Sequence, residues 1–332
     1  MAIWRSPTQV SAGPCPERRR PNTALLGGRI YNATMRLPNS IDTRKFCAGK
    51  TAFAGRDWSY DFKQIPVALE EDFAKKKIEK LLSRYAKITK SWNDHDNSIW
   101  ICRLYMATKL IMMATLQVNS LQFAGRVNLR VASPHLQYYS LLSLARAVCL
   151  TIPEIDWADG ELLKMSHARA IKQTVDYLAS FDRSLAQSVN DAIRSAKAQR
   201  ELIDYRAPTS GDAKIGALQD LILKCRLLAE FAQLNSELLE SSFEKHNSNS
   251  DFDVEDEEIM KILSVEIEGE VFLDDEDYYR VGYILRKHPR PASLQMLMTD
   301  GHVEDFFGAW CDKEDKEASF DPDSDLGVIF DI

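Results

Sequence analysis

Apolar residues recur every three or four positions between residues 66 and 246, which is the spacing of an amphipathic α-helix. The first such run begins after Glu70, with acidic residues in its first turn and lysines later, as the helix dipole favours. The polar residues 93–98 interrupt the pattern and supply an N-cap for a second helix. The next run, residues 99–123, is the most apolar in the chain. The pattern therefore predicts two helices ahead of the central region.

The 99–123 run is close in length to a membrane span, which needs about 20 mostly apolar residues. Arg103, Lys109 and Asn119 interrupt it, and a bilayer penalises charged side chains at its centre. We therefore expect a buried core helix and no membrane partner.

The central stretch, residues 133–243, predicts four helices around which the rest of the chain is arranged. Ser133 is placed to cap the first of them, and Pro134 suits the first helical position. The predicted elements are a helix that begins at Ser133-Pro134 and ends at Pro153, a second over about 160–180, a third capped by Asp182 and ended by the turn at 207–211, and a fourth over about 213–243.

Residues 247–251 are polar and predict a linker, and the residues beyond it contain several short helical patterns. The stretch 265–272 alternates apolar and charged residues, so one strand or an extended arm is also predicted there. Residues 1–40 show no periodicity, and we expect a mobile leader; an alternative is that Met35 is the biological start. The sequence thus predicts an all-α protein, with a helical bundle over 66–246 and a mostly helical extension over 251–332.

Charge is unevenly distributed along the chain. Residues 251–332 hold 24 Asp and Glu against 7 Lys and Arg, whereas the remainder holds 25 acids and 35 bases. A basic body favours binding of an anion such as nucleic acid, and an acidic extension would mask that surface or recruit a basic protein partner. The alternative is that both are ordinary solvated surfaces.

The chemistry-bearing motifs that are easiest to find in a sequence do not occur. There is no phosphate-binding loop, dinucleotide fingerprint, zinc-protease motif or nucleophile elbow, so we expect no cofactor. The six cysteines are scattered and form no CxxC pair, which favours a reducing, cytoplasmic location over disulfides and argues against zinc. The aspartates from Asp321 lack the glycine position of a calcium loop. His95 lies between two aspartates, and we expect it in a solvated loop rather than in a metal site.

Two polar residues occupy apolar stripes of the central helices. His167 shares a predicted face with Leu163 and Ile171, and Arg200 continues the stripe of the next helix with Asp204 one turn later. A buried arginine must be paired, so an Arg200–Asp204 ion pair with a satisfied core histidine nearby is one interpretation. The other is that Arg200 and His167 meet across the helix pair, where arginine would hold a phosphodiester and histidine would move its proton.

These residues also carry a family resemblance. The run Tyr138-Tyr139-Ser140-Leu141-Leu142-Ser143-Leu144-Ala145-Arg146-Ala147, a helix bearing Ser166-His167, and Arg200-Glu201-Leu202-Ile203-Asp204-Tyr205 together resemble the HEPN superfamily of four-helix domains. The resemblance covers about a third of the chain and implies a HEPN-like bundle over 133–243. Such domains occur in prokaryotic toxin–antitoxin, phage-defence and RNA-processing systems, and they often form homodimers.

The chain departs from that family at the nuclease motif. Active HEPN ribonucleases carry an arginine followed by a histidine four to six residues later, whereas Arg200 is followed by Asp204 and Tyr205. The spacing occurs instead between Arg130 and His135, at the start of a different helix. The resemblance therefore implies a member without the standard ribonuclease motif.

The leading expectation is a cytoplasmic protein of defence or toxin–antitoxin type that associates with RNA. The alternatives are a metal-independent ribonuclease and a non-catalytic helical scaffold or regulator that binds a protein through its acidic region. The candidate catalytic residues are His167, Arg200 and Asp204, and the candidate nucleic-acid contacts are Arg146, Lys197, Arg200 and Arg206.

Overall fold

A computed structural model describes residues 52–211, 220–249, 251–253, 255–298, 302–310 and 320–330 of the chain. The predicted leader over 1–40, Met35 and the predicted start of the fourth central helix lie outside these residues. The described chain is mostly helical, which confirms the predicted all-α class.

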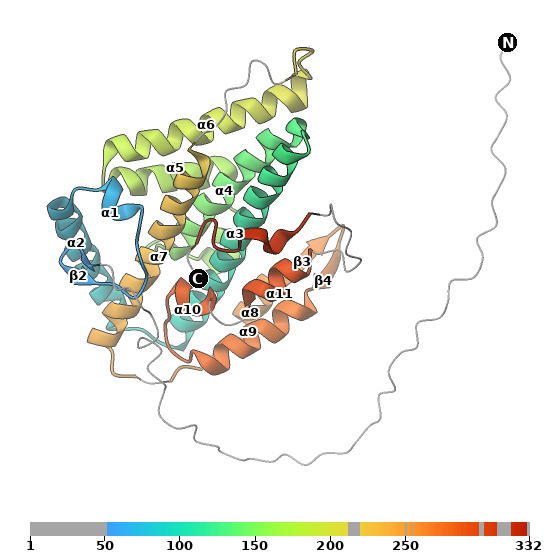
Figure 1. Cartoon of the computed structure of the whole chain (residues 1–332). Helices are drawn as coiled ribbons and strands as arrows, with labels where there is room; N and C mark the ends of the chain where they lie inside the picture. The colour runs from blue at the N-terminus through green and yellow to red at the C-terminus, as the bar shows by residue number, and fades with distance from the viewer. Residues whose placement is uncertain are drawn as a thin grey trace, which may run out of the picture. The chain divides into compact units, whose positions relative to one another are not determined.

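Six long helices form the body of the described structure (Figure 1). They are α2 (Glu71–Thr89), α3 (Asp94–Arg126), α4 (Ser133–Thr151), α5 (His167–Ala179), α6 (Arg183–Arg206) and α7 (Leu221–His246). Helix α4 is at the centre because it packs against α3, α5, α6 and α7. Its sequence is apolar nearly all round, as expected of a helix that is covered on several sides.

Helix α3 confirms the predicted core helix and begins earlier than expected. Asn93 and Asp96 form a reciprocal capping box, so His95 lies in the first helical turn rather than in a loop. By length and composition α3 could cross a membrane, but 72% of its most apolar window is buried inside the described body.

A buried arginine ties α3 to the end of α4. The Arg103 guanidinium donates to the carbonyl oxygens of Leu150 at 2.7 Å, Ile155 at 2.8 Å and Ile152 at 2.5 Å, and more weakly to that of Cys149. Leu150 and Cys149 belong to the last turn of α4, where a helix runs out of its own N–H donors, and Ile152 and Ile155 follow it. In the sequence Arg103 is an interruption of an apolar run, and its structural role is to cap a neighbouring helix.

Two buried glutamates of α7 hold the N-terminal part of the described chain. That part comprises a two-residue hairpin, β1 (Ala52–Phe53) and β2 (Arg56–Asp57), and the short helix α1 (Ile65–Ala68). Glu230 accepts hydrogen bonds from the backbone N–H groups of Lys63, Gln64 and Ile65, and Glu237 accepts from Ser59. Desolvation raises the pKa of both carboxyls, and these backbone donors oppose it.

The described residues of 255–298, 302–310 and 320–330 pack against the body, chiefly against α3. Their elements are α8 (Asp256–Leu263), β3 (Ser264–Ile267), β4 (Glu270–Leu273), α9 (Asp275–Lys287), α10 (Leu294–Met298), α11 (His302–Gly308) and the 3₁₀ helix η4 (Pro322–Asp325). Along α3, Trp100 donates to the Ala292 carbonyl, Tyr105 to Asp277, and Asn119 to the Pro322 carbonyl. Buried hydrogen bonds therefore attach the acidic extension to α3 at these three points. Where one strand or an extended arm was expected over 265–272, the structure has an antiparallel hairpin of two strands, β3 and β4.

Several predicted boundaries were wrong for identifiable reasons. Ala132 is the N-cap of α4, and Ser133 is already helical because the 3₁₀ helix η2 (Arg130–Ala132) runs directly into it. The helix predicted over 160–180 is split into the 3₁₀ helix η3 (Ala158–Lys164) and α5. Positive φ angles at Asp159 and Gly160 interrupt the first part. Leu163 and His167 therefore do not share a helical face.

Candidate functional site

The predicted site residues converge where α4 lies against α5 and α6. Tyr138, Tyr139 and Arg146 come from α4, His167 is the first residue of α5, and Arg200 lies in the second half of α6. On α6 the buried residues Val189, Ile193 and Ala196 form a stripe that Arg200 continues, which places a guanidinium against α4. We call the group formed by Tyr138, Tyr139, His167, Arg200, Asp204 and His135 the tyrosine–arginine cluster.

Arg200 is the centre of this cluster, with 14% of its side chain exposed. Its Nη1 donates to the Tyr139 hydroxyl at 3.0 Å, and its Cζ lies 5.0 Å from the centroid of the Tyr138 ring. Its Nε lies 3.6 Å from Asp204 Oδ2, an ion pair too long to be a hydrogen bond. The buried Nε has no hydrogen-bond partner, and the Asp204 carboxylate is the anion that faces it.

His167 is exposed and belongs to the same cluster. Its Nδ1 lies 3.2 Å from the Tyr138 hydroxyl, and this hydrogen bond leaves Nε2 for other partners. Burial lowers the pKa of His167, and the positive charges of Arg146, Arg200 and Lys197 lower it further. The imidazole is therefore neutral at neutral pH, the form that accepts a proton.

His167 and Arg200 are linked through the two tyrosines rather than directly. Tyr138 bonds the imidazole and Tyr139 bonds the guanidinium, and the two phenol rings are 5.1 Å apart in an edge-on arrangement. Among the described contacts, no hydrogen bond joins His167 to Arg200. The structure thus places both residues at one site, with Tyr138 and Tyr139 between them.

The structure adds His135, which the sequence places at a helix start outside the expected nuclease motif. Its Nε2 lies 2.8 Å from Asp204 Oδ1, so Asp204 is shared between an imidazole and Arg200. In a helix that starts near Ser133, residues three and four apart lie on one face, so His135 shares a face with Tyr138 and Tyr139. This spacing could have identified His135 as a site residue from the sequence. In the sequence, His135 was considered only as the partner of Arg130 in a nuclease-like spacing.

The predicted nucleic-acid contacts divide into two groups. Arg146 and Lys197 act electrostatically on His167 together with Arg200. Arg146 also donates to the Met165 carbonyl at 2.6 Å, which fixes the turn just before His167, while Lys197 pairs with Glu201 at 3.6 Å. Arg206 is an exposed residue of the last turn of α6 and is not among the charges that shift His167.

A separate group of potential metal ligands joins α3 to α8. One ligand atom from each of His95, Glu255 and Glu258 lies within 4.8 Å of the others. Glu258 is already engaged, because Lys261 Nζ is 2.6 Å from one oxygen and Trp157 Nε1 donates to the other at 2.7 Å. The Lys261 ammonium supplies the positive charge that a metal would bring, so these contacts are those of an interhelical ion-pair network.

Comparison with protein-family models, with curated proteins and with solved structures gave no match.

Proposed function

We propose that this chain is a cytoplasmic, HEPN-like protein that binds RNA at the tyrosine–arginine cluster, in a toxin–antitoxin or phage-defence setting. The observation that carries the proposal is that Arg200, bonded to Tyr139, and the exposed His167, bonded to Tyr138, lie at one site. The setting and the HEPN-like assignment rest on the resemblance of Tyr138–Ala147, Ser166-His167 and Arg200–Tyr205 alone.

The chemistry of the cluster suits a phosphodiester. Arginine presents a fork of donors that matches phosphate oxygens, and Arg200 places such a fork at the centre of the cluster. Single-stranded RNA is bound by stacking of bases on aromatic rings together with cationic contacts to the backbone. Tyr205, on the same helix, is 74% exposed and offers a ring for such stacking.

The test measures binding of a fluorescein-labelled, mixed-sequence 20-nucleotide single-stranded RNA by the full chain across a salt series. Arg200→Gln should weaken binding at least tenfold, and Arg200→Lys should recover part of it because the charge returns without the fork. Arg194→Gln is the matched control, because Arg194 is exposed on the same helix. Equal affinities for the Arg200 and Arg194 variants, with helix content unchanged, would remove the proposal.

A second candidate is a metal-independent ribonuclease, which the neutral state of His167 favours. In that mechanism Nε2 of His167 removes a proton from the ribose 2′-hydroxyl, whose oxygen bonds to the adjacent phosphorus. The P–O5′ bond breaks to leave a 2′,3′-cyclic phosphate, the 5′-oxygen takes a proton from water, and Arg200 stabilises the charge that develops on the phosphate. Asp204 would orient Arg200 or His135. His167→Ala should then abolish cleavage of the RNA while leaving its binding within about threefold. Cleavage by this variant at the wild-type rate would exclude the assignment.

A further inference from the structure

One side of α2 carries a row of basic side chains that lies apart from the tyrosine–arginine cluster. We call it the α2 basic row, and its members are Lys76, Lys77, Lys80, Arg84 and Lys87. Between Lys75 and Lys90 the chain has seven bases and a single acid, Glu79. Side chains three and four residues apart are neighbours on a helix, so the row extends over about three turns, roughly 15 Å.

The opposite side of α2 explains why the row faces outward. Ile78, Leu81 and Tyr85 are fully buried, and α2 packs against α7. Lys76, Lys80, Arg84 and Lys87 are exposed, whereas Lys77 is half-buried. The burial of the apolar stripe therefore fixes the rotation of the helix and with it the direction of the bases.

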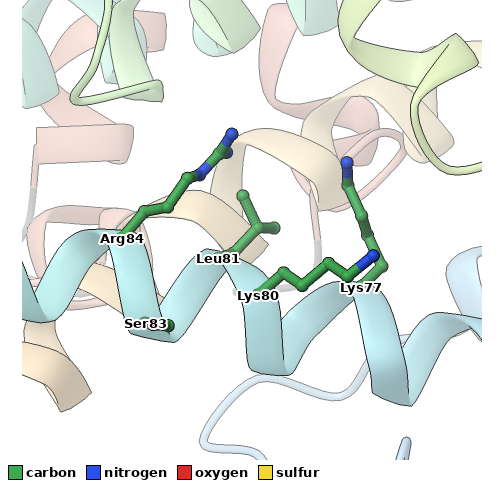
Figure 2. A pocket seen from close by; sticks show the side chains of 5 residues that line it. All are labelled: Lys77, Lys80, Leu81, Ser83 and Arg84. Atoms are coloured by element: carbon green, nitrogen blue, oxygen red, sulfur yellow. The ribbon is translucent and has the colours of Figure 1, made fainter.

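The row borders a hollow in the protein surface. Its lining residues are Lys77, Lys80, Leu81, Ser83 and Arg84, and Figure 2 shows Lys77 and Arg84 rising from the same side of α2 with Leu81 between them. Lys80 extends from the helix towards Lys77 in the same view. The hollow is open, and four of the five residues that line it carry polar or charged groups.

Carboxylates neutralise this surface only in part. Arg84 Nε pairs with Glu154 at 3.0 Å, and Lys77 Nζ lies 5.3 Å from the centroid of the Phe181 ring. Burial and then the charges of Arg84 and Lys80 lower the pKa of Lys77, while Glu154 opposes this effect. Within the described part of the chain, no ion pair involves Lys76, Lys80 or Lys87. The row therefore presents uncompensated positive charge to which an anion would bind.

We infer that the α2 basic row is a second RNA-binding surface, which contacts the phosphate backbone of the strand held at the tyrosine–arginine cluster. This inference rests on the proposed function for the identity of the ligand. Lys77 lies over Phe181, two residues before α6 begins, and Arg200 lies 17 residues further along that helix. By the helical rise, residues 183 and 200 are about 25 Å apart along α6, a length that about seven stacked nucleotides span at the roughly 3.4 Å spacing of a duplex strand.

A membrane surface fits α2 less well than a nucleic acid does. A helix that lies in a bilayer interface exposes apolar residues beside its bases. The apolar side of α2 is buried by the bundle, and Phe73, outside the row, is its one large apolar residue with nearly half its surface exposed. Phosphates of a flexible strand need no apolar surface, only a row of cations with access to solvent.

The experiment compares two triple variants of the full chain with the labelled 20-nucleotide RNA. In the first, Lys76, Lys80 and Lys87 are changed to Gln, which removes three exposed charges and preserves helix propensity. In the control, Lys245, Arg286 and Arg290, which are exposed elsewhere, are changed to Gln. The slope of log affinity against log salt concentration should decrease in magnitude by about 2 for the row variant. For the control variant it should decrease by less than about 0.5.

The outcomes separate this inference from the proposed function. If the row variant keeps the wild-type slope while Arg200→Gln weakens binding, the row is not an RNA contact and the cluster proposal stands. If the salt dependence of RNA binding becomes shallower for the row variant while Arg200→Gln binds as wild type, the row is the RNA site and the cluster proposal fails. Two results would overturn the inference outright: a row variant that loses binding only to vesicles of phosphatidylcholine and phosphatidylserine (7:3), or one that only dissociates a dimer, with the RNA slope unchanged.

Discussion

The Tyr139 hydroxyl accepts a hydrogen bond from Arg200 Nη1 at 3.0 Å, across the contact between α4 and α6. This bond aligns the guanidinium of a residue on an otherwise apolar stripe. Without it, Arg200 would keep its ion pair with Asp204 and lose its fixed orientation.

Tyr139→Phe should therefore weaken RNA binding about fivefold, because it removes the acceptor and keeps the ring. A single hydrogen bond to a charged group contributes about 1.5 kcal/mol, of which part is regained by rotation towards Asp204. Tyr205→Phe, on an exposed ring of the same helix, should change affinity less than twofold if only stacking is involved. Titration by fluorescence anisotropy measures both, and a larger loss for Tyr205→Phe would contradict the role given to Tyr139.

Asp204→Asn tests whether this carboxylate is catalytic or competes with the ligand for Arg200. Since Asp204 pairs with both Arg200 and His135, its neutralisation leaves more positive charge at the cluster. RNA binding should tighten about threefold to tenfold and depend more steeply on salt. Asp191→Asn, at an exposed position of the same helix, serves as the control. Weaker binding by Asp204→Asn would show that the carboxylate supports the site.

The imidazole of His167 should titrate below the ordinary value of about 6.5. Burial and the neighbouring cations disfavour its protonated form, so Lys197→Gln should raise the pKa. His95 is an internal control, because its hydrogen bond to Glu255 raises the pKa of His95, whereas the pKa of His167 is lowered. Two-dimensional NMR of the histidine ring protons follows both titrations in one sample.

The pKa shifts of His167 and His95 make the stability of the fold depend on pH in opposite directions. With a lowered folded pKa, His167 favours the folded state above about pH 6.5, and this contribution is lost as the pH falls through its folded pKa. The raised pKa of His95 stabilises the folded state below about pH 6.5, the pKa of the imidazole in the unfolded chain. This stabilisation is lost as the pH rises through the folded-state pKa. His167→Gln and His95→Gln should therefore change the urea midpoint in opposite pH ranges. Identical pH profiles for the two variants would contradict both assignments.

Arg103→Met should destabilise the fold by about 3 kcal/mol, because it removes a buried guanidinium that donates to the carbonyls of Leu150 and Ile152 at the end of α4. Burial lowers the pKa of Arg103 to about 10, so the guanidinium remains charged at neutral pH. Arg126→Met, at the exposed end of α3, should change the urea midpoint by the equivalent of less than about 0.5 kcal/mol. Equal unfolding free energies for the two variants would show that water or a shift of α4 satisfies those carbonyls.

The elements that the sequence predicted well are those with strong local signals. Helix α6 begins after Asp182, whose side chain accepts from the Leu185 N–H as expected of an N-cap. The alternation over 265–272 indicated extended backbone, whereas the division into two strands at Gly269, which has a positive φ, was not predicted. Such features depend on residues within a few positions of one another.

The features that the sequence did not reveal depend on distant residues. His135 and Asp204 are 69 positions apart, and only the packing of α4 against α6 brings them together. The break before His167 arises at Met165 and Ser166, whose ψ angles of 134° and 154° separate η3 from α5. The sequence named a meeting of Arg200 and His167 as one of two interpretations, but His167 is the exposed first residue of α5 and does not lie on the predicted stripe with Leu163. Tyr138 and Tyr139, which link the two side chains, were noted in the sequence only as part of the family resemblance.

The anchoring of residues 59–65 by Glu230 and Glu237 has a consequence for the order in which the protein folds on the ribosome. The donors of these hydrogen bonds precede their acceptors by 165 to 178 positions. At 5–20 residues per second, roughly ten to thirty seconds of synthesis separate them. Helix α1 and the loop before it therefore emerge from the ribosome long before their acceptors, and they can dock only after α7 has been made.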